Sequence, residues 1–274
     1  RLHTFEQAER AVGMIRKAGF KNLNLDLIFG LPDQTMEAWQ ESVEAILALE
    51  PEHISMYALT LEEGTPLWQR QDELNLVSND DQADEYLWAV NRLAEQYEVS
   101  NFAKEGYRSR HNRKYWLGQE YVGVGPSAHS DFGGRRYSYV RDLEAYITGM
   151  LTGGVIVDSS EMIPPEERGY EYLMLRMRTV EGIEGSEYSS TFRMNFTPVE
   201  QKLELFRDSG WVVQEDNGRW HFTPTGFLLS NQLIGELLES QEENRLEVML
   251  ATHRAQQAAE AAEAAAKEEV SAEV

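Results

Sequence analysis

Apolar residues recur at helical and strand spacings in alternation along the first hundred residues. Spacing near 3.6 predicts helices, which cover residues 5–18, 36–47 and 80–97. Short runs between and after them predict strands, at residues 22–29, 53–60 and 97–103. Thr4 and Gln7 form a capping-box pattern ahead of the first helix. This alternation predicts an α/β fold with a parallel sheet, whose ligands bind at the carboxyl ends of the strands.

The first predicted strand has one polar face. Asn22, Asn24 and Asp26 alternate with leucines, whereas a strand buried on both faces of a parallel sheet is usually apolar throughout. The next strand repeats the alternation from His53 onward. The leucines suit packing against helices, so we expect the polar row to face a wet or ligand-filled space such as a barrel lumen. A half-exposed edge strand is the alternative.

The pattern changes after residue 150. Further helices are predicted at residues 164–177, 186–192 and 198–209. A hairpin follows with Asp216, Asn217 and Gly218 at its turn, and a last helix begins near Thr225. This order predicts a small, mostly helical, winged-helix-like domain. Residues 251–274 are rich in alanine and glutamate and predict a solvated tail, partly helical or disordered.

Composition and charge limit the partners. The net charge of −22 comes from 47 acidic against 25 basic residues, and phosphate backbones repel so acidic a chain. We therefore expect no nucleic acid partner, and a structural or protein-contact role for the winged-helix-like domain. No apolar run approaches the roughly 20 residues of a membrane helix and no signal peptide opens the chain, so a cytoplasmic protein is expected. The absence of cysteine excludes thiolate-held zinc and iron–sulfur centres within this chain.

Four separated strings carry a resemblance to a known family. They are DLIFGLPDQT, PEHISMYALTLEEGTP, YEVSNFAKEGYRSRHNRKYW and YVGVGPSAHS, in this order. They resemble the second half of HemW-type proteins. These form the heme-chaperone branch of the radical S-adenosylmethionine (SAM) family, which is related to oxygen-independent coproporphyrinogen III oxidase. The resemblance runs from Arg1 to about residue 240.

This resemblance implies the C-terminal portion of a partial (β/α)6 radical SAM barrel, followed by a small C-terminal domain. The expected division is barrel, connecting segment, C-terminal domain and tail, at residues 1–105, 106–155, 156–242 and 243–274. Family members carry a CxxxCxxC motif for a [4Fe-4S] cluster and a glycine-rich SAM loop, and this chain contains neither. We expect an N-terminally truncated product of a protein whose full-length form binds both groups. A natural cluster-free paralogue is the alternative.

The resemblance also implies SAM contacts at three residues. An aspartate implicated in the related oxidases falls on Asp26, which the polar face independently turns toward the lumen. A second contact falls on Ala58, through its backbone. His129 stands where the oxidases have an apolar residue, and it is a further candidate ligand or SAM neighbour. For Asp26, a buried polar side chain satisfied by its neighbours is the alternative.

The HNxxY motif of HemW-type proteins, linked to heme binding, falls on His111, Asn112 and Tyr115. A neutral imidazole is a standard axial ligand of heme iron, so His111 is the expected metal ligand. Asn112 would orient the loop or the imidazole. Tyr115 and Trp116 offer flat faces to a porphyrin, and nearby cations could pair with its propionates, namely Arg110, Arg113 and Lys114. A surface loop packed on the barrel is the alternative.

Three functions remain open. The first is a heme chaperone that passes heme to an acceptor protein, with a homodimer as a further option. The second is a radical SAM enzyme that decarboxylates coproporphyrinogen III. The HNxxY motif favours the chaperone, and the missing cysteines remove radical chemistry from this chain in either case. The third is a remnant without function or a stable fold.

Overall fold

The N-terminal half is built on a four-stranded sheet with strand order β1-β2-β4-β3. The computed structural model describes residues 3–93 and 95–272, and side chains up to residue 258. Strands β1 (Asn24–Phe29) and β2 (His53–Ala58) are parallel. Helix α2 (Met36–Leu47) connects them, and its N-cap Thr35 accepts a hydrogen bond from the Ala38 amide. Apolar side chains of α2 are buried on the sheet, as the helical spacing predicts.

The prediction of a single parallel strand at residues 97–103 is wrong. Instead of one parallel strand, residues 96–103 form a tight hairpin of β3 (Gln96–Glu98) and β4 (Asn101–Ala103). Strand β4 runs antiparallel to β2. Helix α4 (Asn79–Leu93) ends earlier than predicted. Glu95 then adopts a left-handed backbone with φ of 55°, and Tyr97, at which the predicted helix and strand overlap, lies in β3.

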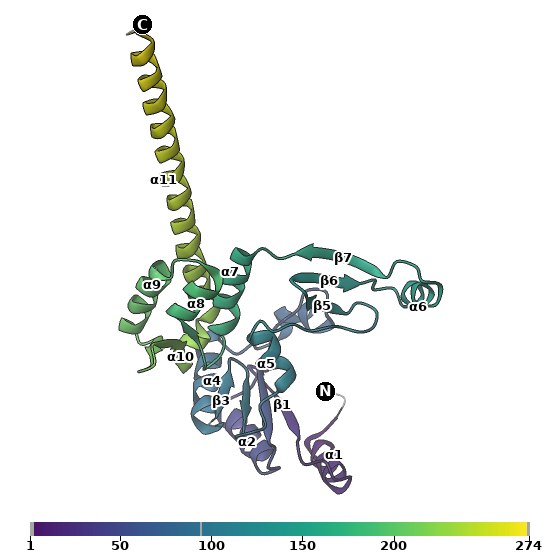
Figure 1. The fold of residues 1–274 in the computed structure, drawn as a ribbon. Helices are drawn as coiled ribbons and strands as arrows, with labels where there is room; N and C mark the ends of the chain where they lie inside the picture. The colour runs from purple at the N-terminus through teal and green to yellow at the C-terminus, as the bar shows by residue number, and fades with distance from the viewer. Residues whose placement is uncertain (1–2, 94, 273–274) are drawn as a thin grey trace.

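Helix α1 (Phe5–Lys17) lies beside the β1 edge of this sheet (Figure 1). Both hydrogen bonds of the predicted capping box between Thr4 and Gln7 are present. Only Val12 of α1 is buried. Arg16 fastens the helix to the sheet through an ion pair of 2.8 Å with Glu52. Two short helices, α3 (Pro66–Gln69) and the 3-10 helix η1 (Gln71–Glu73), precede α4.

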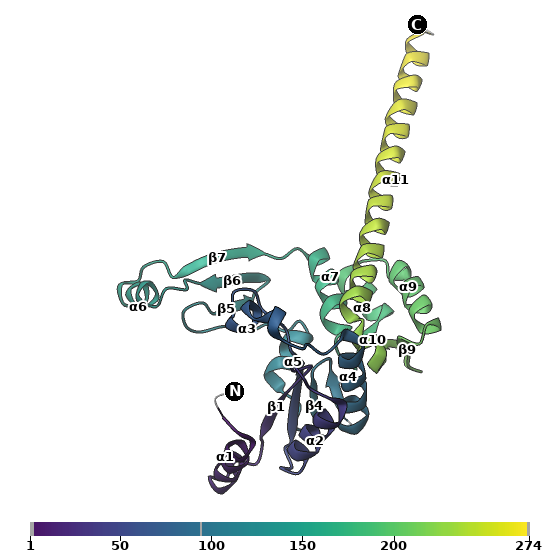
Figure 2. The same ribbon diagram turned by 180° about the vertical axis from the view of Figure 1, so that it is seen from behind.

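A second sheet projects sideways from the body as an arm (Figure 1). Its antiparallel strands are β5 (His129–Phe132), β6 (Arg135–Tyr139) and β7 (Val157–Met162), in that order. Helix α6 (Leu143–Thr152) lies between β6 and β7 in the chain, at the far end of the arm. Helix α5 (Arg110–Trp116) lies between the arm and the first sheet (Figure 2).

The C-terminal part contains the predicted helices and hairpin. The helices are α7 (Pro165–Arg176), α8 (Gly185–Phe192), α9 (Thr197–Asp208), α10 (Pro224–Leu228) and α11 (Ser230–Ala272). The hairpin strands are β9 (Val212–Gln214) and β10 (Arg219–Phe222), and β8 (Ile183–Glu184) completes their sheet. Helix α11 continues through the predicted tail and leaves the body as a single rod (Figures 1 and 2).

One hydrophobic core joins the two parts. It contains Leu27 and Trp39 from the first sheet and its helix, together with Leu173 and Leu233 from the C-terminal helices. Because the core crosses from one part to the other, the first sheet and the C-terminal helices stabilise each other. Within the described ranges, no helix has the length and apolar character required to span a membrane.

Candidate functional site

Polar side chains form a row on one face of β1 and β2. The parallel register places Asn24 beside His53 and Asp26 beside Ser55. Successive residues of a strand point to opposite faces, so the alternating leucines point away from this row. Of these, Leu23 and Leu27 are buried. The predicted polar and apolar faces of the first strand are therefore confirmed.

The start of the HNxxY segment lies across an open cavity from this polar row. The cavity has a volume of about 720 Å³. Its walls are the polar strand residues on one side and the loop into α5 on the other, namely Asn22, Asn24, His53, Ser55 and residues 106–112. His111 and Asn112 thus lie at the same cavity as Asn24 and His53, although 58 positions separate His53 from His111 in the sequence.

A directed chain of hydrogen bonds crosses the row. The Asn24 amide nitrogen donates to Asp26 Oδ1 at 2.6 Å, which leaves Asn24 Oδ1 to accept from His53 Nδ1 at 2.6 Å. With its proton on Nδ1, His53 accepts at Nε2 from the Tyr97 hydroxyl at 2.8 Å. The Tyr97 oxygen in turn accepts the Ser109 amide at 3.3 Å. The chain therefore runs from Asp26 to the start of α5.

Burial sets the protonation of this chain. The pKa of His53 is lowered because burial disfavours the charged imidazolium, and the nearby Asp26 carboxylate opposes this only in part. Burial also raises the pKa of Tyr97 to about 12, so the phenol keeps its proton. At neutral pH the chain is therefore a neutral imidazole and a neutral phenol, which matches the donor and acceptor roles assigned from the distances.

Helix α5 presents the motif residues on its surface. Ser109 is the N-cap, and its hydroxyl accepts from the Asn112 amide at 3.3 Å. His111 and Tyr115 are four residues apart and therefore share one face of the helix. Their rings meet edge to face, and the Tyr115 hydroxyl lies 2.9 Å from His111 Nε2. His111, Asn112 and Tyr115 are all exposed, so a ligand can reach them.

Ion pairs fasten α5 to the C-terminal part. Arg108 and Arg113 each bind the same carboxylate oxygen of Glu181 at 3.1 Å. Tyr121 packs edge to face on Tyr115, with ring centroids 4.7 Å apart. Since Arg113 is engaged with Glu181, the cations of α5 that have no ion pair in the described residues are Arg110 and Lys114.

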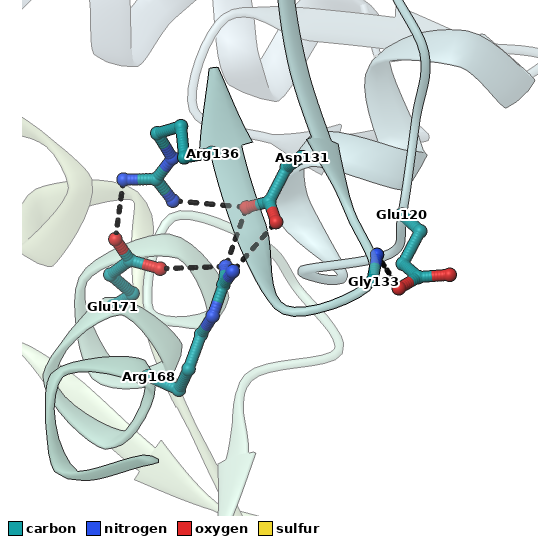
Figure 3. A network of polar contacts seen from close by, with 6 residues as sticks. All are labelled: Glu120, Asp131, Gly133, Arg136, Arg168 and Glu171. Carbon is teal, nitrogen blue, oxygen red and sulfur yellow. Dashed lines mark hydrogen bonds and ion pairs between the residues drawn. The ribbon is translucent and has the colours of Figure 1, made fainter. Parts of the chain in front are cut away.

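Next to Tyr121 lies an ion network of four residues, namely Asp131, Arg136, Arg168 and Glu171. Tyr121 and Asp131 exchange two backbone hydrogen bonds, of 2.8 and 3.0 Å. Figure 3 shows the Asp131 carboxylate between Arg136 and Arg168, with Glu171 joining the two arginines. The hydrogen bonds from Arg168, and then those from Arg136, lower the pKa of Asp131 although burial opposes the shift. The network therefore ties β5 and β6 of the arm to α7.

The three residues expected at SAM lie apart from this cavity. Asp26 is exposed on β1 and accepts a hydrogen bond from Asn24, which lines the cavity. Ala58 is exposed at the last position of β2, opposite Phe29. His129 is exposed at the start of β5. Its carbonyl oxygen lies close to Gly123, and a Cβ added at Gly123 would overlap that oxygen. None of Asp26, Ala58 and His129 lines this cavity.

Two contributors to the site were missed in the sequence. Tyr97 stands where the predicted helix and the predicted strand overlap, and no local pattern brings it to His53; the pairing of β3 is irregular at this point. The ion network had no local signal, because Asp131 and Arg168 are 37 positions apart. The family's [4Fe-4S] cluster does not fit the residues of this chain, which contains no cysteine. Within the described side chains, no three His, Asp or Glu residues are grouped as metal ligands.

Comparisons with known proteins agree with this architecture. Residues 163–229 match the family model of the HemN C-terminal domain. A heme chaperone HemW from Lactococcus lactis subsp. lactis (strain IL1403) is 34% identical over 87% of this chain and 64% of its own length. A heme chaperone HemW from Synechocystis sp. (strain ATCC 27184 / PCC 6803 / Kazusa) is 31% identical over 89% of this chain and 65% of its own length. The resemblance to HemW-type proteins is confirmed.

A solved structure shows the same fold. Coproporphyrinogen III oxidase (HemN) from Escherichia coli, a radical SAM enzyme, matches with a TM-score of 0.66 at 17% identity, over 88% of this chain and 59% of that one. The expected α/β fold class is therefore confirmed. The sheets are small, and the described residues contain no closed barrel. The chain spans slightly under two thirds of the length of the HemW relatives.

Proposed function

We propose that this chain acts in heme binding, as a heme chaperone of the HemW type. The observation that carries the proposal is the exposed pair of His111 and Tyr115 on α5, of which His111 lines a polar cavity. The relatives bear the name heme chaperone, and they supply the expectation that heme then passes to an acceptor protein. We place this activity in the cytoplasm.

His111 would provide the axial ligand of the iron, since imidazole nitrogen is a standard ligand there. The exposed ring of Tyr115 and the half-buried ring of Trp116 would offer flat apolar contacts. Arg110 and Lys114 would pair with the propionates, because Arg113 is already held by Glu181. The Asn112 side chain would orient the loop or the imidazole, at a position where the Asn112 backbone N–H donates to the Ser109 hydroxyl.

The proposal includes SAM binding, with contacts at Asp26, Ala58 and His129. The exposed carboxylate of Asp26 could accept hydrogen bonds from a ribose hydroxyl or an amine, and Ala58 would contribute its backbone. SAM and a [4Fe-4S] cluster would be bound in the full-length form of the family. This chain offers the cluster no thiolate, so none of its residues would hold it.

The enzymatic alternative is not favoured. The relatives that cover most of this chain are named heme chaperones. The similarity to the oxidase lies at 17% identity and therefore concerns the fold. Fold similarity by itself does not transfer an activity.

A hemin titration followed at the Soret band tests the proposal. We expect a saturable shift with the wild-type chain and a loss of affinity of at least about tenfold for His111→Ala, because an iron–imidazole bond is removed. His253→Ala is the matched control, since His253 is also exposed on a helix with a partner four residues away, Gln257. Equal effects of the two substitutions, or no saturation with wild type, would contradict the proposal.

A further inference from the structure

The buried His53 is linked to the helix that carries His111. Only 6% of His53 and 1% of Tyr97 is exposed. The Tyr97 hydroxyl donates to His53 Nε2 and accepts from the Ser109 amide. Ser109 caps α5, two residues before His111. A hydrogen-bonded path therefore leads from the interior of the first sheet to the first turn of α5.

Several contacts hold Tyr97 in this position. Its ring lies edge-on to His53, with centroids 5.6 Å apart. The Arg108 guanidinium lies over the ring at 5.6 Å and is itself paired with Glu181. Because these groups are buried, leaving any of them without its hydrogen-bond partner costs free energy. The Tyr97 phenol is therefore held in this orientation.

Histidine suits the position because both of its nitrogens are used. Nδ1 donates to Asn24 and Nε2 accepts from Tyr97, so the tautomer is fixed from both sides. An apolar residue would leave the buried Tyr97 hydroxyl without its acceptor. A glutamine could place its carbonyl oxygen near the position of Nε2 and restore that acceptor.

We propose that His53 is a positioning residue for heme binding. It fixes Tyr97, and Tyr97 fixes the N-terminal turn of α5, so that His111 is presented at the mouth of the cavity. His53 itself lies in the cavity wall opposite this turn, and the role proposed for it is exerted through Tyr97. The proposal rests on the proposed heme function and adds a second requirement to it, at a residue outside the HNxxY motif.

Hemin titration of His53→Leu, His53→Gln and Tyr97→Phe tests the proposal. Losing one buried hydrogen-bond partner should weaken binding by roughly tenfold for His53→Leu and for Tyr97→Phe. His53→Gln should stay within about threefold of wild type, because the acceptor for Tyr97 is restored. The double variant His53→Leu/Tyr97→Phe should bind no more weakly than either single one, since both interrupt the same path.

Backbone amide exchange supplies a readout that does not depend on heme. Exchange at residues 109–112 should be faster in His53→Leu and Tyr97→Phe than in wild type, because the first turn of α5 loses its anchor. His221→Leu is the matched control. His221 also has both ring nitrogens engaged, but in the C-terminal hairpin, so its loss should change neither heme affinity nor exchange at α5.

The outcomes separate the two proposals. If His53→Leu and Tyr97→Phe bind hemin like wild type while His111→Ala does not, the positioning role is overturned and the heme proposal stands. If the wild type shows no saturable shift, the heme proposal fails, and unchanged exchange at residues 109–112 would then also exclude an anchoring role of His53. Should His53→Leu fail to fold, Tyr97→Phe decides, because it removes a single oxygen atom.

Discussion

The Tyr115 hydroxyl lies 2.9 Å from Nε2 of His111, the two residues being one helical turn apart on α5. A hydrogen bond between residues four apart stabilises a short helix. This hydrogen bond also occupies Nε2, a nitrogen through which histidine commonly binds iron. Heme ligation through Nε2 would therefore require the hydroxyl to release it.

Tyr115→Phe keeps the flat ring and removes this competing hydrogen bond. Because such a bond contributes about 1 kcal/mol, we expect hemin affinity to be unchanged or to rise by up to about fivefold. Tyr115→Ala, which also removes the ring, should weaken binding. Soret titrations of both variants provide the measurement. A marked loss with Tyr115→Phe would show that the hydroxyl takes part in binding and does not compete with it.

Asp26 and His111 should affect different ligands. Asp26→Asn removes a charge on β1 but keeps an Oδ1 that can accept from Asn24, so the hydrogen-bond chain to α5 persists and hemin binding should remain within about twofold of wild type. His111→Ala should weaken it sharply. Parallel hemin titrations of the two variants give the comparison, and equal losses would overturn the assignment of two separate sites.

Asp131 should stabilise the fold at neutral pH. Its side chain is only 11% exposed and accepts hydrogen bonds from two arginines, so Asp131→Asn should lower the free energy of unfolding by about 2 kcal/mol. Its pKa is lower in the folded protein than in the unfolded chain. The contribution is therefore present above the unfolded pKa and is lost as the pH falls through the folded pKa.

Urea unfolding at pH 7 and at several values below about pH 4, the ordinary aspartate range, measures this dependence. The difference between wild type and Asp131→Asn should shrink on acidification. Arg70→Ala is the control, because the pair of Arg70 and Glu73 is exposed and such pairs contribute less than about 1 kcal/mol. A gap for Asp131→Asn that stays constant with pH would contradict the ion-pair origin.

Two helical glycines should respond oppositely to alanine. A Cβ at Gly226 in α10 would overlap the carbonyl oxygen of Trp211, whereas a Cβ at Gly235 in α11 would meet nothing within 4 Å. We expect Gly226→Ala to destabilise by about 1–3 kcal/mol through overpacking. Gly235→Ala should stabilise by about 0.5–1 kcal/mol through helix propensity. Thermal melts compare them, and equal shifts of the two melting temperatures would refute the packing argument.

Local patterns were sufficient for much of the fold. The polar and apolar faces of β1 follow from a period of two within a single strand. The capping box at Thr4 and Gln7 depends on residues three apart. The hairpin of the C-terminal part follows from the turn at Asp216 to Gly218. Each of these signals lies within one element, which is why sequence reading detects it.

Contacts between distant segments could not be predicted from the sequence. Strands β3 and β4 have three residues each, which is too few to show a period of two, so the sequence predicts one strand where the chain reverses. The residues His111, Asn112 and Tyr115 came from the family resemblance, and the neighbouring polar row came from periodicity. That His111 and Asn112 share a cavity with this row depends on the path of residues 104–109, which no local pattern encodes.

Helix α11 contains 43 residues, which at 1.5 Å per residue corresponds to a rod of about 65 Å. The side chains of residues 246–258 are exposed around its whole circumference. Such a rod increases hydrodynamic drag well beyond that of a sphere of 31.4 kDa. On gel filtration a monomer should therefore elute early and be mistaken for a dimer. Light scattering, which measures mass independently of shape, is the appropriate way to count subunits.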